Sequence, residues 1–148
     1  DQLICVAIAK HSDFKLEGIE DERTLLHARL IRDADKLDNC RVKLEESMET
    51  LLDMDEKTVG ASPISPKVWE SCKAEKSVLS ADRKTGMDYW MSYLALYFDI
   101  NFPETYQIIK EQDYIRRIAE RVPYSREDTK EKVAYTVKKL EEKMNIQP

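Results

Sequence analysis

The chain has 148 residues, of which 36% are charged and 42% hydrophobic, and its formal net charge is -5. This length fits one domain, or one domain with a small addition, and is enough for a hydrophobic core. An acidic chain without a cluster of basic residues argues against nucleic-acid binding and against attachment to an anionic membrane surface. No apolar run approaches the roughly 20 residues of a membrane-spanning helix.

The three cysteines, Cys5, Cys40 and Cys72, are widely spaced and odd in number. This usage predicts reduced thiols in a cytoplasmic protein and argues against a cysteine-based zinc site. Asp1 and Gln2 lead directly into an apolar helical pattern. That start predicts a chain that begins inside a domain, as a fragment would.

The first two helices are expected over residues 2–11, buried on most sides, and from Asp21 onward, with Asp21 as the cap. A loop over residues 13–20 connects them. The second helix carries apolar residues at i, i+4, i+8 and i+11, which predicts a stripe facing the core. The stripe consists of Leu26, Leu30, Ala34 and Leu37. Asp35 lies at the edge of this stripe.

A cluster of Asp, Gly, Ser and Pro over residues 53–65 predicts a linker. Ser65-Pro66 is typical of a helix start and predicts a short helix over residues 66–75. Thr85 and Asp88 form a pattern like a capping box. The helix after Thr85 is apolar nearly all round and should lie at the centre of a bundle; its apolar residues include Met87, Trp90, Met91, Leu94 and Phe98.

Two further helical regions complete the chain, one capped by Asn101 and ended by Pro123, the other capped by Ser125. The last helix has a narrow apolar stripe: Val133, Val137, Leu140 and Met144. Its charged residues are either a solvated surface or the flank of a partner helix. Helices without any convincing strand predict an all-α fold, a helical bundle.

The stretch from Arg32 to Asn39 holds three carboxylates and two cations within an otherwise apolar helical pattern. It lacks the glycine of an EF-hand loop, and the chain contains no phosphate-loop or nucleophile-elbow motif. With these motifs excluded, the remaining candidate is a metal site that combines a carboxylate on a helix, Asp35, with a separate histidine, His11. These donors suit Mn, Fe, Co, Ni or Zn, or Mg if carboxylates dominate. Spacing alone favours the alternative, a surface aspartate and a hydrogen-bonded histidine at a helix end.

The stretch HSDFKLEGIEDERTLLHARLIRDADKLDN, residues 11–39, resembles the second half of an HD-superfamily metal-dependent phosphohydrolase domain. Members carry a late aspartate in a phrase such as ADKLD, and Asp35 matches it. Lys36 matches the basic position that follows, and His11 resembles a histidine found at a helix end before this phrase. The stretch YLALYFDINFPET, residues 93–105, is also similar to the C-terminal region of bacterial members.

The resemblance implies an HD-like, partial fold in which residues 1–52 are the last helices of the domain, 53–65 a linker and 66–148 a helical region packed on it. It also implies a hydrolase that uses water activated by a divalent metal ion on a phosphomonoester or nucleotide. Asp35 would be a metal ligand, and Lys36 and His11 would act on the substrate as catalytic residues.

The family's early histidine and its His-Asp pair are absent, since the chain has only His11 and His27. The resemblance therefore implies that a missing N-terminal part of the same domain supplies these ligands, and that the chain alone is inactive. The alternative is a non-catalytic helical interaction module or a degenerate HD protein. The substrate, the metal and the oligomeric state are left open.

Overall fold

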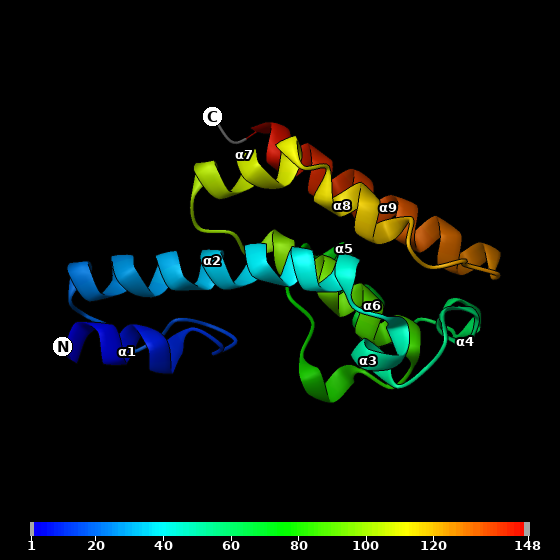
Figure 1. The fold of residues 1–148 in the computed structure, drawn as a ribbon, viewed down its shortest axis with the longest axis horizontal. Helices are drawn as coiled ribbons and strands as arrows, with labels where there is room; N and C mark the ends of the chain where they lie inside the picture. Colours follow the sequence, from blue (N-terminus) through cyan, green and yellow to red (C-terminus); the bar gives the residue numbers. More distant parts are fainter. Residues whose placement is uncertain (1, 147–148) are drawn as a thin grey trace.

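The computed structural model describes residues 2–146 and consists, over these residues, of helices and connecting loops without strands (Figure 1). This confirms the all-α class. The α-helices are α1 (Gln2–Lys10), α2 (Glu22–Glu45), α3 (Met48–Leu52), α4 (Glu56–Ala61), α5 (Pro66–Lys73), α6 (Gly86–Ala95), α7 (Pro103–Glu111), α8 (Tyr114–Ala119) and α9 (Glu127–Ile146). Two 3-10 turns are η1 (Ser80–Asp82) and η2 (Leu96–Phe98). None of the described helices combines the length and apolar character needed to cross a bilayer.

Helix α6 lies at the centre of the molecule and packs against α4, α5, α8 and α9. The predicted capping box at its start is present: the Thr85 hydroxyl accepts from the Asp88 amide, and the Asp88 carboxylate accepts from the Thr85 amide. Trp90, Met91 and Leu94 have no exposed surface. Complete burial of each such side chain contributes roughly 1.5–3 kcal/mol. The prediction that this aromatic-rich helix forms the core is confirmed.

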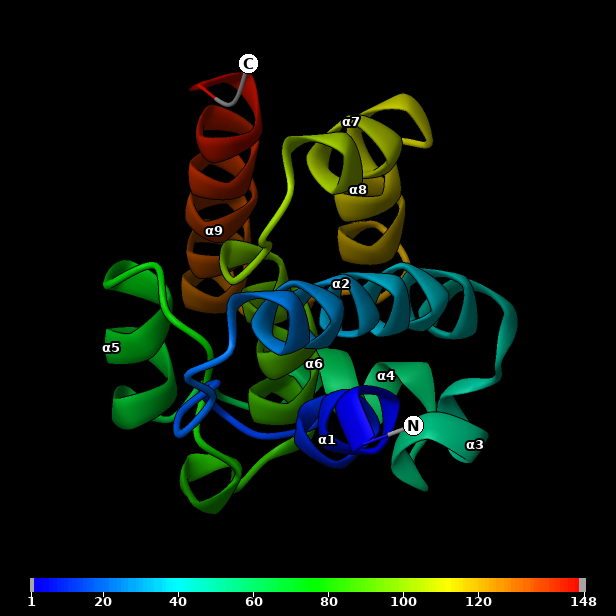
Figure 2. The same cartoon turned by 90° about the vertical axis from the view of Figure 1, so that its left-hand side faces the viewer.

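Helix α2 crosses the molecule between the α7–α9 layer and the α3–α6 layer (Figures 1 and 2). Asp21 caps it as expected, accepting from the Thr24 amide at 2.8 Å. Most of the predicted apolar stripe, however, faces away from the core: Leu26, Leu30 and Ala34 are exposed, and Leu37 packs against the core cluster. The residues that α2 buries are Ala28, Arg32, Asp33, Lys36, Cys40 and Lys43. The prediction was wrong for the first three members of the stripe, because distant segments supply partners for the buried charges, as described below.

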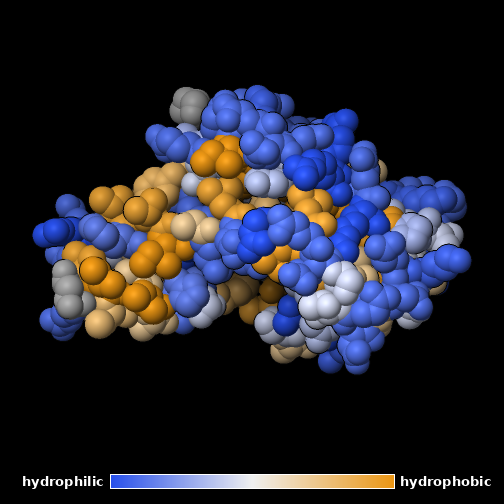
Figure 3. Space-filling view, viewed as in Figure 1, coloured by the Kyte–Doolittle hydropathy of each residue, from blue (hydrophilic) through white to orange (hydrophobic). Residues whose placement is uncertain are grey.

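Helix α1 packs mainly on α2, and the two form a hairpin at one end of the molecule (Figure 1). Burial of α1 on most sides was expected, but Ala7 is its buried residue. Four apolar side chains of the hairpin are 49–56% exposed: Ile4, Ile8, Leu26 and Leu30. We call them the hairpin face, and Figure 3 shows the corresponding apolar surface over α1 and the first half of α2.

The segment over residues 53–65, expected to be a linker, contains α4, which Asp55 caps. Val59 and Ile64 of this segment belong to one hydrophobic core cluster, whose members run from Cys40 to Met144. Gly60 lies against Pro123: a Cβ at Gly60 would be 2.2 Å from the Pro123 carbonyl oxygen. Close backbone packing therefore joins this segment to the start of the last helical region.

Three further expectations concern the C-terminal half. Helix α7 has Phe102, not Asn101, at its N-cap position, and α9 begins at Glu127, so Ser125 is not its cap. The apolar stripe of α9 faces the interior, and of its members Val133, Leu140 and Met144 are buried. The stripe therefore packs into the chain's own core, and a partner helix against the charged residues of α9 stays a prediction.

Candidate functional site

The side chains of His11, Asp35 and Lys36, which the sequence singles out, line one cavity. The cavity has a volume of about 280 Å³. Its walls come from the turn after α1, the middle of α2 and parts of the chain between residues 77 and 99. Segments far apart in the sequence thus meet at the place where the ADKLD phrase lies.

Lys36 is almost fully enclosed, with 8% of its side chain exposed. Its ammonium group lies 3.2 Å from a carboxylate oxygen of Asp99 and also donates to the Asp99 backbone carbonyl. Burial lowers the pKa of Lys36, while the attraction of Asp99 opposes this shift. The ammonium group already has an internal counter-ion, so any anion in the cavity would share it with Asp99.

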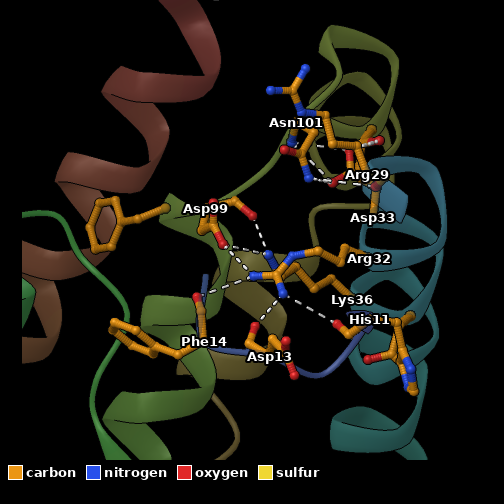
Figure 4. A network of polar contacts seen from close by, with 12 residues as sticks. His11, Asp13, Phe14, Arg29, Arg32, Asp33, Lys36, Asp99 and Asn101 are labelled. Atoms are coloured by element: carbon orange, nitrogen blue, oxygen red, sulfur yellow. Dashed lines mark hydrogen bonds and ion pairs between the residues drawn. The ribbon is translucent and has the colours of Figure 1, made fainter. Parts of the chain in front are cut away.

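Arg32, one turn before Lys36, fixes the turn that carries His11 (Figure 4). Its guanidinium donates to the carbonyls of His11, Asp13 and Phe14, and to the Asp99 carboxylate at 3.0 Å. Backbone carbonyl groups of a turn that packs against the protein need donors in place of water. Arg32 supplies them, and it thereby ties the end of α1 to α2.

Asp99 connects this cluster to the turn after α6. Burial acts to raise the pKa of Asp99, but the positive charge of Lys36 and hydrogen bonds from Arg32 and Lys36 outweigh burial and lower the pKa below its ordinary value. The carboxylate is therefore held in its charged form. Sequence reasoning missed Asp99, because its two cationic partners lie 63 and 67 residues earlier in the chain.

Asp33 is buried on the α7 side of α2, where it acts as a cap for another helix. Its carboxylate accepts from the amides of Asn101 and Phe102, from the Asn101 side chain, and from the Thr105 hydroxyl at 2.7 Å. A negative charge at a helix N-terminus is favourable. Asp38, on the exposed side of the same helix, pairs instead with Arg41 at 3.1 Å.

Asp35, in contrast, is exposed, and its carboxylate has one hydrogen-bond donor, the Asn39 side-chain amide at 3.3 Å. His11 is half-buried at the end of α1, with Nδ1 2.6 Å from the Ile8 carbonyl oxygen. A carbonyl can only accept, so Nδ1 carries the proton and Nε2 of the neutral ring is the free acceptor. Both groups can therefore act as ligands, the carboxylate of Asp35 and Nε2 of His11.

These two donors do not make a complete metal site. Within residues 2–146, no group of three or more His, Cys, Asp or Glu side chains is arranged to hold a metal ion. Catalytic zinc sites, for comparison, use three protein ligands. The nearby thiol of Cys40 does not help, because burial raises its pKa to about 11 and keeps it protonated. The residues of the described chain fit, at most, part of a metal site.

Comparisons with protein-family models, with curated proteins and with solved structures each found no match to this chain. Membership of the HD superfamily therefore stays a prediction, as do the metal-ligand role of Asp35 and the catalytic roles of Lys36 and His11. The domain boundaries at residues 52, 65 and 66 also stay predictions.

Proposed function

We propose that this chain forms part of the active site of an HD-type, metal-dependent phosphohydrolase that acts on a phosphomonoester or nucleotide. One observation carries the proposal: Asp35, Lys36 and His11 line a single cavity, and the carboxylate of Asp35 is open to it. In this proposal Asp35 is a metal ligand, His11 borders the site and Lys36 adds positive charge beside it. Free thiols at Cys5, Cys40 and Cys72 favour a cytoplasmic location.

The remaining metal ligands must then come from outside the described residues, because Asp35 and His11 are too few. The hairpin face supports this view, since a soluble domain seldom leaves several large apolar side chains of adjacent helices uncovered. After Leu30, the next exposed residues along α2 are Ala34 and Asp35. They therefore continue the exposed surface of the helix from the hairpin face toward the cavity. We propose that a further part of the same domain covers the hairpin face and brings its ligands beside Asp35.

The test uses the protein as its gene encodes it, including any residues before Asp1. We expect Asp35→Ala to remove the bound metal and to lower hydrolysis of p-nitrophenyl phosphate by more than about 100-fold, since residues that only orient metal ligands already cost 10–100-fold. Asp38→Ala, an exposed aspartate on the same helix, is the matched control and should change neither quantity.

Unchanged metal content and hydrolysis in Asp35→Ala would refute the role of Asp35. The isolated 148-residue chain should bind no stoichiometric divalent metal and hydrolyse no phosphoester. Activity of the isolated chain would show that the other ligands are not needed, and it would refute the composite site.

A second candidate is a non-catalytic helical interaction module. It is favoured by the ion pairs of Lys36 and Arg32 with Asp99, which reduce the positive charge that these two cations offer to a phosphate. In this case the protein as encoded lacks bound metal and hydrolytic activity, and substitutions on the hairpin face remove binding of the partner. Metal analysis of the purified protein separates the two candidates.

A further inference from the structure

A second and larger cavity, of about 640 Å³, lies on the other side of the Arg32–Asp99 ion pair. Its walls come from the loop after α1, from α2, from residues 71–79 and from residues 98–101. Arg32 and Asp99 line both cavities and so form a shared wall. The volume falls in the range of roughly 300–1,000 Å³ that is usual for small-molecule sites.

Apolar side chains form much of the surface of this cavity. Phe14 is 45% exposed and Leu79 is 49% exposed, so both leave apolar surface open to water beside the cavity. Leu25 and Phe98 contribute further apolar surface. A ligand with an apolar or aromatic body would remove these groups from water, at a gain of about 25 cal/mol for each Å² of apolar surface buried.

Positive charge predominates among the other lining residues. Lys15, Arg29 and Lys76 line the cavity, and none of them takes part in an ion pair within residues 2–146. Arg32 pairs with Asp99, which it shares with Lys36, so the lining charges outside this pair are these three cations and Glu75. The backbone carbonyl of Arg29 accepts from the Asn101 side chain at 3.5 Å, beside the α7 N-terminus, as Figure 4 shows.

We propose that this cavity binds a small amphipathic anion. Its apolar or aromatic body lies against Phe14, Leu79 and Phe98, and its carboxylate, phosphate or sulfonate oxygens accept hydrogen bonds from Arg29 and Lys76. Arginine is suited to this role because its planar guanidinium can donate to two oxygens of one anionic group. The inference does not depend on the metal site, because Asp35 does not line this cavity.

The experiment is a titration of the 148-residue chain with 8-anilinonaphthalene-1-sulfonate and with its uncharged analogue N-phenyl-1-naphthylamine, both followed by fluorescence. We expect one saturable site for the sulfonate and binding at least tenfold weaker for the analogue. Arg29→Gln should weaken the sulfonate about tenfold, the effect of one charge-assisted hydrogen bond, and leave the analogue unchanged. Leu79→Ser should weaken both compounds.

Two variants serve as controls and distinguish binding in this cavity from binding to the hairpin face or to the other cavity. Leu26→Ser with Leu30→Ser removes exposed apolar groups from the hairpin face, and Asp35→Ala alters the other cavity; neither should change the affinity for the sulfonate. The proposal is overturned if no saturable binding occurs, or if the two compounds bind equally well. It is also overturned if the hairpin-face variant loses binding while Arg29→Gln and Leu79→Ser retain it.

Discussion

Asp33 shows what a single buried carboxylate does in this fold. Only 1% of the residue is exposed, and the carboxylate accepts from groups at the start of α7 that would otherwise lack partners. A buried donor without an acceptor costs about 1–3 kcal/mol. The polar contacts of Asp33 therefore fix the position of α7 on α2, and the neighbouring Arg32 and Lys36 fix the turn that carries Asp99.

We predict that Asp33→Ala lowers the free energy of unfolding by about 3 kcal/mol, because the Asn101 and Phe102 amides and the Thr105 hydroxyl lose a charged acceptor. Asp38→Ala is the control: that aspartate is exposed and pairs with Arg41, so the change should stay within about 0.5 kcal/mol. Urea denaturation followed by circular dichroism measures both. Equal effects of the two substitutions would contradict the capping role of Asp33.

At the scale of whole elements, local signals predicted the starts of α2, α5 and α6 correctly and the orientation of most of the α2 stripe incorrectly. Asp21 and Thr85 cap their helices through hydrogen bonds to amides three residues later, and Pro66 begins α5 through its fixed backbone angle, so these signals can be recognised in a sequence. The buried face of α2 depends on partners such as Asp99 and Thr105, more than 60 residues away. A periodic apolar pattern shows that a helix has two faces, but it does not show which face meets the core when the charged face has distant partners.

Helix α4 provides a test at this scale. We predict that Gly60→Ala destabilises the protein by about 2 kcal/mol, because the new methyl group would meet the Pro123 carbonyl oxygen at 2.2 Å. This cost exceeds the gain of about 1 kcal/mol in helix propensity. Gly86→Ala is the comparison: its nearest neighbours are at 3.2 Å and include the flexible Met54 side chain, so the loss should be smaller. Denaturant midpoints of the two variants in the reverse order would contradict this packing.

At the scale of the molecule, the core and the candidate site differ in how well the sequence predicts them. The α6 core could be predicted, because a helix that is apolar on all sides can only be stable when buried. The cavity with His11, Asp35 and Lys36 could be predicted only through the family resemblance, because nothing in the spacing of these residues shows that they meet. The role of Asp99 and the existence of the larger cavity depend on tertiary packing and had no local signal.

The hairpin face also gives a whole-molecule prediction. Leu30→Glu should leave the melting temperature within about 2 °C of the parent chain, since an exposed side chain adds little to the stability of the isolated chain. It should also reduce self-association, because it interrupts an apolar patch. Differential scanning calorimetry and analytical ultracentrifugation measure the two effects. Met91→Glu, in the buried core, should prevent folding; similar destabilisation by Leu30→Glu would show that Leu30 belongs to the core.

The charged face of α2 has a consequence for synthesis on the ribosome. Arg32, Asp33 and Lys36 bond to residues 63 to 72 positions later in the chain. In a growing chain that has completed α2, Arg32 can already bond to the carbonyls after α1, but Asp33 and Lys36 lack these partners until residues 99–105 have left the exit tunnel. During that interval water hydrates these charges. This face of the nascent helix therefore exposes charged groups and not apolar side chains. Docking of α2 has to wait for α6 and α7, so the N-terminal hairpin joins the core late even though it is made first.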